Sequence, residues 1–455
     1  MKKRMYKIMA LAMTAAMVVP MAAQTTAFAA DDKEITYWNI AVESPDKDIV
    51  TAAVDKFNKE TKSGYTVNQV AIQNDTYKEK LVIAMSSGEC PDMYSSWSGG
   101  PMYEYIDSGF AQPIDDLLDQ SDVKDKLLDA AIEQGSYNGH VYAIPYLNVS
   151  LAGIFYNKDM FKQYGLEEPK TLADLENICA TLKENGITPF ALANASKWTG
   201  SMYFMSLAAR YGGLEPFQNA VAGTGKFTDD CFIKAGEKIQ EWVNNGYFPD
   251  GVNSLSEDDG QAKQLMYQET AGMLLCGSWY AGTFQTDSEE FYQKIGWFPF
   301  PAIDDSDADP TIQIGTVGDQ FISFNCEGDK LAAAFECAAD HLSDEVEDMI
   351  YSTGKIAPVK DAGDHISDPV VKEIFDAAQE ASSIQLWYDQ YLPTSVASAH
   401  LDGLQEVFGL TKTPQEAQEE MQKAMDEYLS TKSDSGAADD TAEEATDDAA
   451  ADDAE

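Results

Sequence analysis

The sequence predicts an α/β protein with two domains, on the evidence of its strand and helix order and of its length. In the first third of the chain, short apolar runs alternate with helix-like segments of about 10 to 15 residues. Such alternation indicates a mainly parallel sheet covered by helices. Some 400 of the 455 residues remain when the two chain ends are set aside, which is more than one hydrophobic core usually holds.

The N-terminal segment 1–29 has the features of a secretory signal peptide. Basic residues precede an apolar run from Ile8 to Ala23, and small residues follow at 27–30. The run is shorter than the roughly 20 residues of a membrane-spanning helix, so we expect export to the periplasm, the cell envelope or the medium. The first cysteine is Cys90, far from the cleavage site, so we do not expect the lipid anchor of a bacterial lipoprotein.

The mature chain is strongly acidic. The formal net charge is −46, and it becomes −50 without the four basic residues of the signal peptide. Nucleic acids and anionic membranes need basic surfaces, so we expect neither as a partner. The six cysteines show no C-x-x-C spacing, and a chain of this length buries an ample core without disulfides. We interpret most of them as small buried apolar residues.

The predicted elements follow in order along the chain. Strands are expected at 34–40, 67–72, from 92, and at 271–276, 295–300 and 311–324. Helices are expected over the stripe Val50, Val54 and Phe57, after Asn74 or Asp75, and at 232–243, 260–267 and from Trp279. From about Lys432 the chain is rich in Ala, Asp and Glu, so we predict a disordered acidic tail at 433–455.

The candidate site residues are aromatic and polar side chains at the ends of these elements. Ligands of parallel sheets bind beyond the carboxyl ends of the strands. A sugar presents apolar C–H faces and a rim of hydroxyls, which suit flat aromatic rings together with carboxylates or amides. The aromatic candidates are Trp97, Tyr146, Trp198, Trp279 and Trp387, and the polar ones are Asn39, Glu43, Asp319, Asp389 and Gln390.

Each candidate also has a structural interpretation. Tryptophans often pack in cores, and Asn39 and Glu43 also fit a solvated turn. Trp279 follows a Gly-Ser turn at a predicted helix start, where a ring can face a cleft. Asp319 heads an apolar strand, where a carboxylate without a partner is costly.

Other chemistries lack the spacing that they need. The segment Gly223–Lys226 is missing the first glycine and the final Ser/Thr of a phosphate-binding loop. The four histidines are scattered without a zinc-binding pair, and no G-x-S-x-G elbow occurs. We therefore expect no metal and no cofactor.

Five phrases, in this order, resemble the extracellular solute-binding proteins, family 1, the sugar-binding receptors of ABC importers. They are NGHVYAIPY (138–146), FYNKDMF (155–161), GMLLCGSW (272–279), GTVGD (315–319) and YLP (391–393). The resemblance implies a two-lobed periplasmic-binding-protein-like (Venus flytrap) fold with discontinuous lobes and a multi-strand hinge. Lobe 1 would hold 30–144 and 300–352, and lobe 2 would hold 149–296 and 358–432. The crossings would fall near Pro145, Phe298 and Lys355.

The resemblance also implies a function. The protein would be a monomeric receptor, not an enzyme, that passes an oligosaccharide ligand to the membrane subunits of an ABC importer. Trp279 would stack on a sugar ring. Two alternatives stay open: a receptor for a non-sugar solute, and a secreted glycoside hydrolase, which would use two carboxylates on opposite sides of a sugar.

Overall fold

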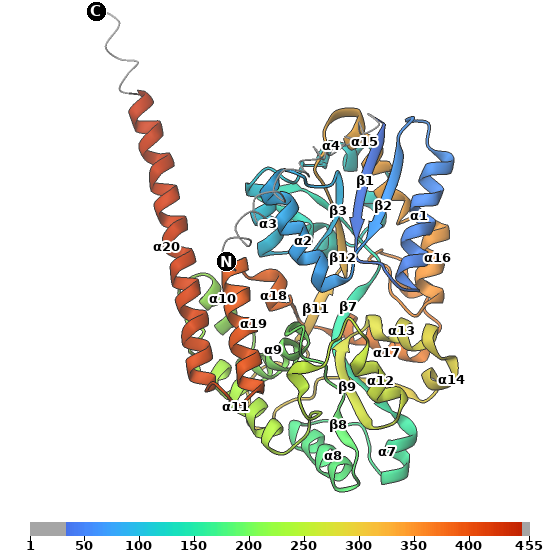
Figure 1. The fold of residues 1–455 in the computed structure, drawn as a ribbon, viewed down its shortest axis with the longest axis vertical. Helices are drawn as coiled ribbons and strands as arrows, with labels where there is room; N and C mark the ends of the chain where they lie inside the picture. The colour runs from blue at the N-terminus through green and yellow to red at the C-terminus, as the bar shows by residue number, and fades with distance from the viewer. Residues whose placement is uncertain (1–32, 448–455) are drawn as a thin grey trace, which may run out of the picture.

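Two β-sheets lie one beyond the other and form the two-lobed fold that the resemblance implies (Figure 1). The computed structural model describes residues 33–447, so the signal peptide predicted at 1–29 lies outside the described residues. Within residues 33–447, none of the helices combines the length and apolar character needed to cross a membrane.

The first sheet has the strand order β2-β1-β3-β12-β6. Its strands are β1 (Glu34–Asn39), β2 (Thr66–Ala71), β3 (Met93–Ser96), β6 (Ala143–Tyr146) and β12 (Gln320–Phe324). The parallel strands β1, β2 and β3 direct their carboxyl ends to one edge, as the strand and helix alternation predicts. β12 is antiparallel to both β3 and β6.

Short connections and helices accompany this sheet. The helices are α1 (Asp46–Glu60), α2 (Asn74–Ser87), α3 (Gly100–Asp107), α4 (Asp115–Asp119), α5 (Val123–Lys126), α6 (Asp129–Gln134), α15 (Gly328–Asp340) and α16 (Asp344–Ser352). A small hairpin joins β4 (Ser136–Tyr137) and β5 (His140–Val141).

The second sheet has the order β13-β11-β7-β9-β8, and β10 pairs with β7 as well. Its strands are β7 (Val149–Asn157), β8 (Thr188–Phe190), β9 (Ala271–Gly277), β10 (Ile295–Pro299), β11 (Gln313–Val317) and β13 (Ile384–Gln385). All nine residues of β7 are buried, because β11 covers one end of the strand while β9 and β10 flank the other.

The helices that follow and surround this sheet make up most of the second half of the chain. They are α7 (Lys158–Tyr164), α8 (Leu172–Glu184), α9 (Trp198–Gly212), α10 (Glu215–Val221), α11 (Asp230–Asn244), α12 (Gln261–Tyr267), α13 (Trp279–Asp287), α14 (Glu289–Tyr292), α17 (Pro369–Glu380), α18 (Tyr388–Tyr391), α19 (Thr394–Phe408) and α20 (Pro414–Asp447). Two single 3₁₀ turns lie at η1 (Val252–Ser254) and η2 (Ala362–Asp364).

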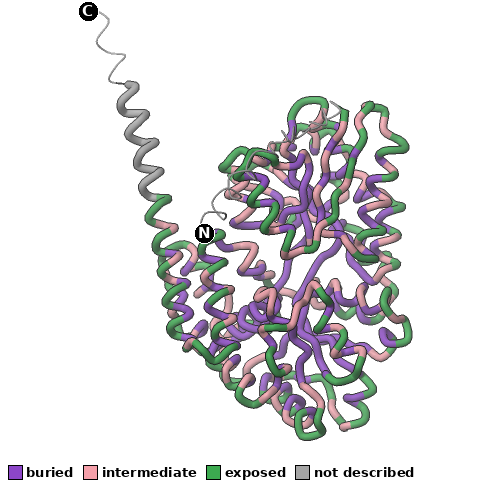
Figure 2. Tube along the Cα trace, viewed as in Figure 1, coloured by how far each residue is buried: buried purple, intermediate pink, exposed green. Residues whose placement is uncertain are grey.

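Burial follows the apolar pattern of the sequence. The stripe Val50, Val54 and Phe57 of α1 is buried, as predicted. Most strands of both sheets and the inner faces of the helices are buried, whereas the edge strand β2 and the outer helix faces are largely exposed (Figure 2). All six cysteines lie within the described residues as free thiols, and five of them are buried.

The chain passes between the sheets where β6 leads into β7, where β11 leads into β12, and after α16. Asn148 ties the first and third of these segments together. Its side-chain Oδ1 accepts a hydrogen bond from the backbone N–H of Ile356 at 2.9 Å, and the Val149 N–H donates to the Ile356 carbonyl at 2.6 Å. These bonds join neighbouring linkers into one hinge region.

The second crossing differs from the expected one near Phe298. The sequence predicts one strand over 311–324, but Gly318 divides it into β11 and β12, which belong to different sheets. Gly318 has a φ of 132°, a backbone conformation that residues with a Cβ rarely adopt. The chain therefore returns to the first sheet at Gly318, and β11 belongs to the second sheet although it falls within the predicted range 300–352.

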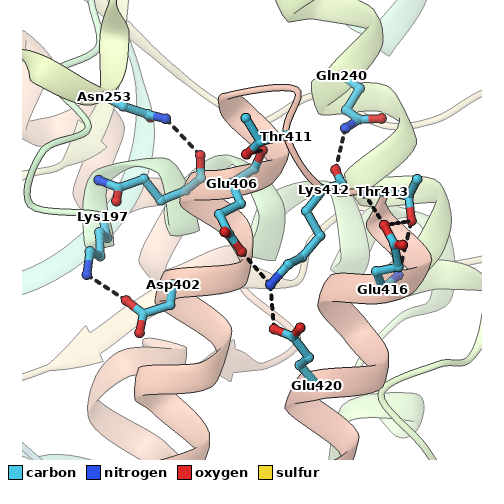
Figure 3. Close-up of polar contacts among 11 residues, drawn as sticks. Lys197, Gln240, Asn253, Asp402, Glu406, Thr411, Lys412, Thr413, Glu416 and Glu420 are labelled. Carbon is cyan, nitrogen blue, oxygen red and sulfur yellow. Dashed lines mark hydrogen bonds and ion pairs between the residues drawn. The ribbon is translucent and has the colours of Figure 1, made fainter.

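Helices α19 and α20 form an antiparallel hairpin whose turn is held by polar contacts (Figure 3). The Lys412 ammonium group pairs with the carboxylates of Glu406 and Glu420. Thr413 caps α20, because its Oγ1 accepts a hydrogen bond from the Glu416 N–H at 3.2 Å while its backbone N–H donates to Glu416 Oε2 at 2.9 Å. Gln240 on α11 donates to the Lys412 carbonyl at 2.8 Å, which attaches the turn to the body.

The C-terminal segment differs from the prediction of a disordered tail at 433–455. Helix α20 continues past residue 433 to Asp447 and extends beyond α19 (Figure 1). Alanine and glutamate are good helix formers, so the segment prolongs a helix whose first turns already pack on the body. The prediction for 448–455 lies outside the described residues.

Candidate ligand-binding site

Two adjoining cavities lie in the cleft between the two sheets. The smaller cavity has a volume of about 250 Å³ and the larger one about 820 Å³. Both cavities share the following lining residues: Ile40, Glu43, Asp46, Glu257, Asp258 and Trp279. These shared walls make the two cavities one continuous site.

Four tryptophans line the smaller cavity, each from the end of an element. Trp97 follows β3, Trp387 precedes α18, and Trp198 and Trp279 are the first residues of α9 and α13. The ring centroids of Trp198 and Trp279 are 6.0 Å apart, and those of Trp279 and Trp387 are 6.1 Å apart. Three rings therefore form a continuous aromatic wall, with Trp279 in the middle.

The turn before Trp279 is anchored on the hinge strand β7. The Ser278 Oγ donates to the Val149 carbonyl at 3.2 Å and accepts from the backbone N–H of Leu151 at 3.3 Å. Gly277 is equally necessary, because a Cβ at this position would overlap the ring of Trp279. The Gly-Ser turn thus places the indole ring directly over the backbone of β9.

Six carboxylate residues line the same cavity: Glu43, Asp46, Glu257, Asp258, Asp319 and Asp389. Burial raises the pKa of Asp319 to about 7; Lys355 lowers this pKa and Asp46 raises it further. Burial also raises the pKa of Glu257 to about 7, although the Tyr280 hydroxyl donates a hydrogen bond to its carboxylate. A ligand that donates hydrogen bonds to either carboxylate would stabilise its ionised form and lower its pKa.

Charged pairs cross the cleft around the cavities. The ammonium group of Lys78 on α2 lies 3.5 Å from the carboxylate of Asp389 on α18 and 5.0 Å from the centroid of the Trp97 ring. Lys263 on α12 lies 3.8 Å from the Glu43 carboxylate on the opposite lobe. These pairs connect the two sides of the site.

Eight of the ten residues predicted from the sequence meet in the smaller cavity: Glu43, Trp97, Trp198, Trp279, Asp319, Trp387, Asp389 and Gln390. Asn39 does not, because it is fully buried and its Oδ1 accepts a hydrogen bond from the Ala41 N–H at 3.0 Å. Tyr146 does not line the cavity either. It is fully buried behind Gln320, to which its hydroxyl donates at 2.9 Å.

The sequence reasoning missed eight lining residues: Ile40, Asp46, Asn74, Lys78, Met202, Glu257, Asp258 and Gln320. Some of them carry a usable signal. Met202 stands four residues after Trp198 on the same helix, so both face one direction. Gln320 follows Asp319 at the start of a strand. Lys78 and Glu257 reach the site only through the packing of the two lobes.

Comparison with known proteins places the chain among binding proteins. Residues 41–339 match the model of the bacterial extracellular solute-binding protein family. The chain is 32% identical over 228 residues to an uncharacterized ABC transporter extracellular-binding protein of Pyrococcus horikoshii, a match that covers 50% of each protein. It is 23% identical over 259 residues to a xylose/arabinose-binding protein of Haloferax volcanii, covering 55% of each. The chain thus spans about half the length of these curated relatives.

Solved structures match over a larger share of the chain. A protein from work on xylan utilization by Caldanaerobius polysaccharolyticus superposes with a TM-score of 0.78 at 29% identity, covering 86% of this chain and 99% of that one. A chitin oligosaccharide binding protein superposes with a TM-score of 0.78 at 23% identity, covering 87% and 98%. These matches confirm the two-lobed fold. Because the family model covers more than half of its residues, the chain belongs to the bacterial extracellular solute-binding protein family.

Proposed function

We propose that this protein is a receptor that binds an oligosaccharide between its lobes and delivers it to the membrane subunits of an ABC importer. The observation that carries the proposal is one cavity lined by four tryptophans and six carboxylate residues. Aromatic faces suit the C–H faces of a sugar ring, and carboxylates accept hydrogen bonds from its hydroxyls. A ligand that touches both lobes stabilises the arrangement in which they are close together.

The size of the site supports a ligand of more than one ring. The cavity of about 250 Å³ is by itself smaller than the ~300–1,000 Å³ of ordinary small-molecule sites. The adjoining cavity adds about 820 Å³ and is lined mainly by polar residues, among them Gln73, Lys263 and Gln264. Trp279 lines both cavities and would hold the ring at their junction.

The names of the relatives support carbohydrate over other solutes. They include the xylose/arabinose-binding protein and a multiple sugar-binding protein of Streptococcus mutans, which is 31% identical over 178 residues. The signal peptide predicted at 1–29 supports export, and we propose that the mature protein acts as a monomer outside the cytoplasm.

A glycoside hydrolase is the competing function, because two carboxyl groups of the cavity have a raised pKa. Such an enzyme keeps one carboxyl group protonated and the other ionised, so their pKa values are pushed apart. Here burial raises the pKa of both Glu257 and Asp319 to about 7, but four other carboxylate residues line the same cavity, so these pKa values do not exclude a pair of acid and base. A receptor is favoured instead by the match to the solute-binding protein family.

A thermal-shift screen of xylo-, cello-, malto- and chito-oligosaccharides with non-sugar solutes as controls tests the proposal. A ligand at 100 times its Kd stabilises the protein by about 2.7 kcal/mol, so a sugar that binds raises Tm clearly. The same samples are analysed for cleavage products after prolonged incubation. A Tm rise with intact sugar is expected, whereas cleavage, or a response to non-sugar solutes alone, would contradict the proposal.

A further inference from the structure

Gln320 is a buried amide in the wall of the tryptophan-lined cavity. It is the first residue of β12, it is 4% exposed, and it lines the cavity beside Asp319. Its cross-strand neighbour in the register of β12 and β6 is Tyr146. The two side chains therefore meet at the edge of the first sheet that faces the cleft.

A chain of buried hydroxyls sets the orientation of this amide. Tyr37 Oη donates to Tyr146 Oη at 3.3 Å, and Tyr146 Oη donates to Gln320 Oε1 at 2.9 Å. Ser95 Oγ lies 3.3 Å from the same Tyr146 oxygen. A phenol has one hydrogen to donate, so Tyr146, while accepting from Tyr37, directs its own hydrogen to Gln320. The amide oxygen is thereby occupied from behind the cavity wall.

The NH₂ end of the same amide is left for the cavity. Among the described residues, Gln320 Nε2 has no hydrogen-bond partner, and it is not one of the buried polar atoms sealed from solvent. The cavity is dominated by acceptors, since six carboxylate residues line it and Lys78 is already paired with Asp389. Gln320 adds an uncommitted donor to this wall.

We propose that Gln320 is a ligand-contact residue that donates a hydrogen bond from its NH₂ group, and that Tyr146 is the positioning residue that holds the amide in this orientation. The inference rests on the proposed carbohydrate-receptor function and specifies the ligand atom. Ring and glycosidic oxygens carry no hydrogen and can only accept, so ionised carboxylates cannot bind them through hydrogen bonds and Gln320 can. A hydroxyl both donates and accepts, so ring and glycosidic oxygens are the ligand atoms that most need a donor such as Gln320.

A double-mutant cycle measured by calorimetry tests this pair. The probes are xylotetraose, cellotetraose, maltotetraose and chitotetraose, and the sugar that wild-type protein binds most tightly is carried through the series. Gln320→Met keeps the length of the side chain but removes the donor, so Kd should rise about tenfold. Tyr146→Phe should raise Kd by a smaller factor, and adding it to Gln320→Met should change Kd no further.

Two further variants separate positioning from packing. Tyr37→Phe removes a hydroxyl of the same buried chain but leaves the Tyr146 donation to Gln320, so its Kd should stay within about twofold of wild type. Gln320→Glu keeps an oxygen for Tyr146 and replaces only the NH₂ group, so it should lose at least as much affinity as Gln320→Met. Thermal unfolding shows whether each variant is folded. If Tyr146→Phe does not fold, the Kd values of Gln320→Met and Gln320→Glu alone test whether the NH₂ group of Gln320 contacts the ligand.

The outcomes are distinguishable. Wild-type binding with an unchanged Kd in Gln320→Met, or independent effects that multiply in the double variant, would overturn the inference and leave the receptor function standing. Absence of binding by the wild-type protein to all four sugars and to their longer homologues would overturn the proposed function, and this inference with it.

Discussion

The indole rings of Trp279 and Trp387 meet edge to face, with centroids 6.1 Å apart and planes inclined at 68°. Trp198 approaches Trp279 from another direction, at 6.0 Å and 58°. Edge contacts of this kind stabilise aromatic pairs and fix the orientation of the rings. Trp279 is therefore held in place before a ligand arrives, which reduces the entropy lost on binding.

Gly277→Ala tests how the ring of Trp279 is positioned. A Cβ at residue 277 would overlap the six-membered ring of Trp279, so the indole must move away from its partners. We expect affinity for the sugar to fall about tenfold, the scale of a lost aromatic contact of about 1.4 kcal/mol. Gly272→Ala is the matched control on β9, because its Cβ would meet the flexible end of Leu182 away from the cavity. Calorimetry that finds equal affinities for both variants would refute this account of the turn.

Asp319→Asn tests the partly buried carboxyl group in the cavity wall. Because burial raises the pKa of Asp319 to about 7, the folded protein holds this proton at pH values where the unfolded chain has released it. The free energy of unfolding should therefore fall as pH rises from about 4 to about 7 and then level off. The ligand-free variant should melt about 2 °C or more above wild type at pH 8, and this difference should shrink toward pH 4. Melting curves of both proteins between pH 4 and pH 8 measure this Tm difference. A Tm difference that does not change with pH would contradict the raised pKa of Asp319.

Truncation after Lys432 tests the role of the C-terminal extension of α20. The buried side chains of α20 include Ala417, Met421 and Met425, and Leu429 still packs against the core. The described packing of the helix thus lies before the cut. We expect Tm to change by less than about 2 °C and sugar affinity to stay the same.

A second truncation, after Thr413, is the control for the first. It removes all of α20 and exposes the apolar surfaces of α11 and α19, so it should lower Tm strongly or prevent folding. A large loss of stability on truncation after Lys432 would show instead that the extension is a structural element.

The sequence predicts several elements around the site well because their signals are local. Alternating strands and helices place Glu43 and Trp97 beyond parallel strands, and a Gly-Ser turn places Trp279 at a helix start. The division at Gly318 was missed because the apolar pattern runs through it, and only a positive φ and a change of sheet partner reveal it. Asn39 was misplaced because its side chain folds back on its own turn, which a strand-end position does not reveal.

Residues that reach the site only through tertiary packing cannot be predicted from local sequence patterns. Lys78 joins the cavity by crossing to Asp389, more than 300 residues away in sequence. Glu257 lies in an acidic run that looks like a solvated loop, and burial in the cleft gives it its raised pKa of about 7. Their roles depend on how the two lobes face each other.

Calorimetric titration of Trp279→Ala with the best oligosaccharide, beside its unfolding curve, tests the central claim most directly. Trp279 is partly exposed and lines both cavities, so its loss should weaken binding at least about tenfold with a modest cost in stability. Trp242→Phe is the control, because Trp242 is fully buried in the core, and it should lower stability and leave affinity unchanged. Lost affinity in a stably folded Trp279→Ala protein is the predicted result. Wild-type affinity together with a large drop in stability would show that Trp279 is a packing residue and would contradict the assignment of this cleft as the sugar site.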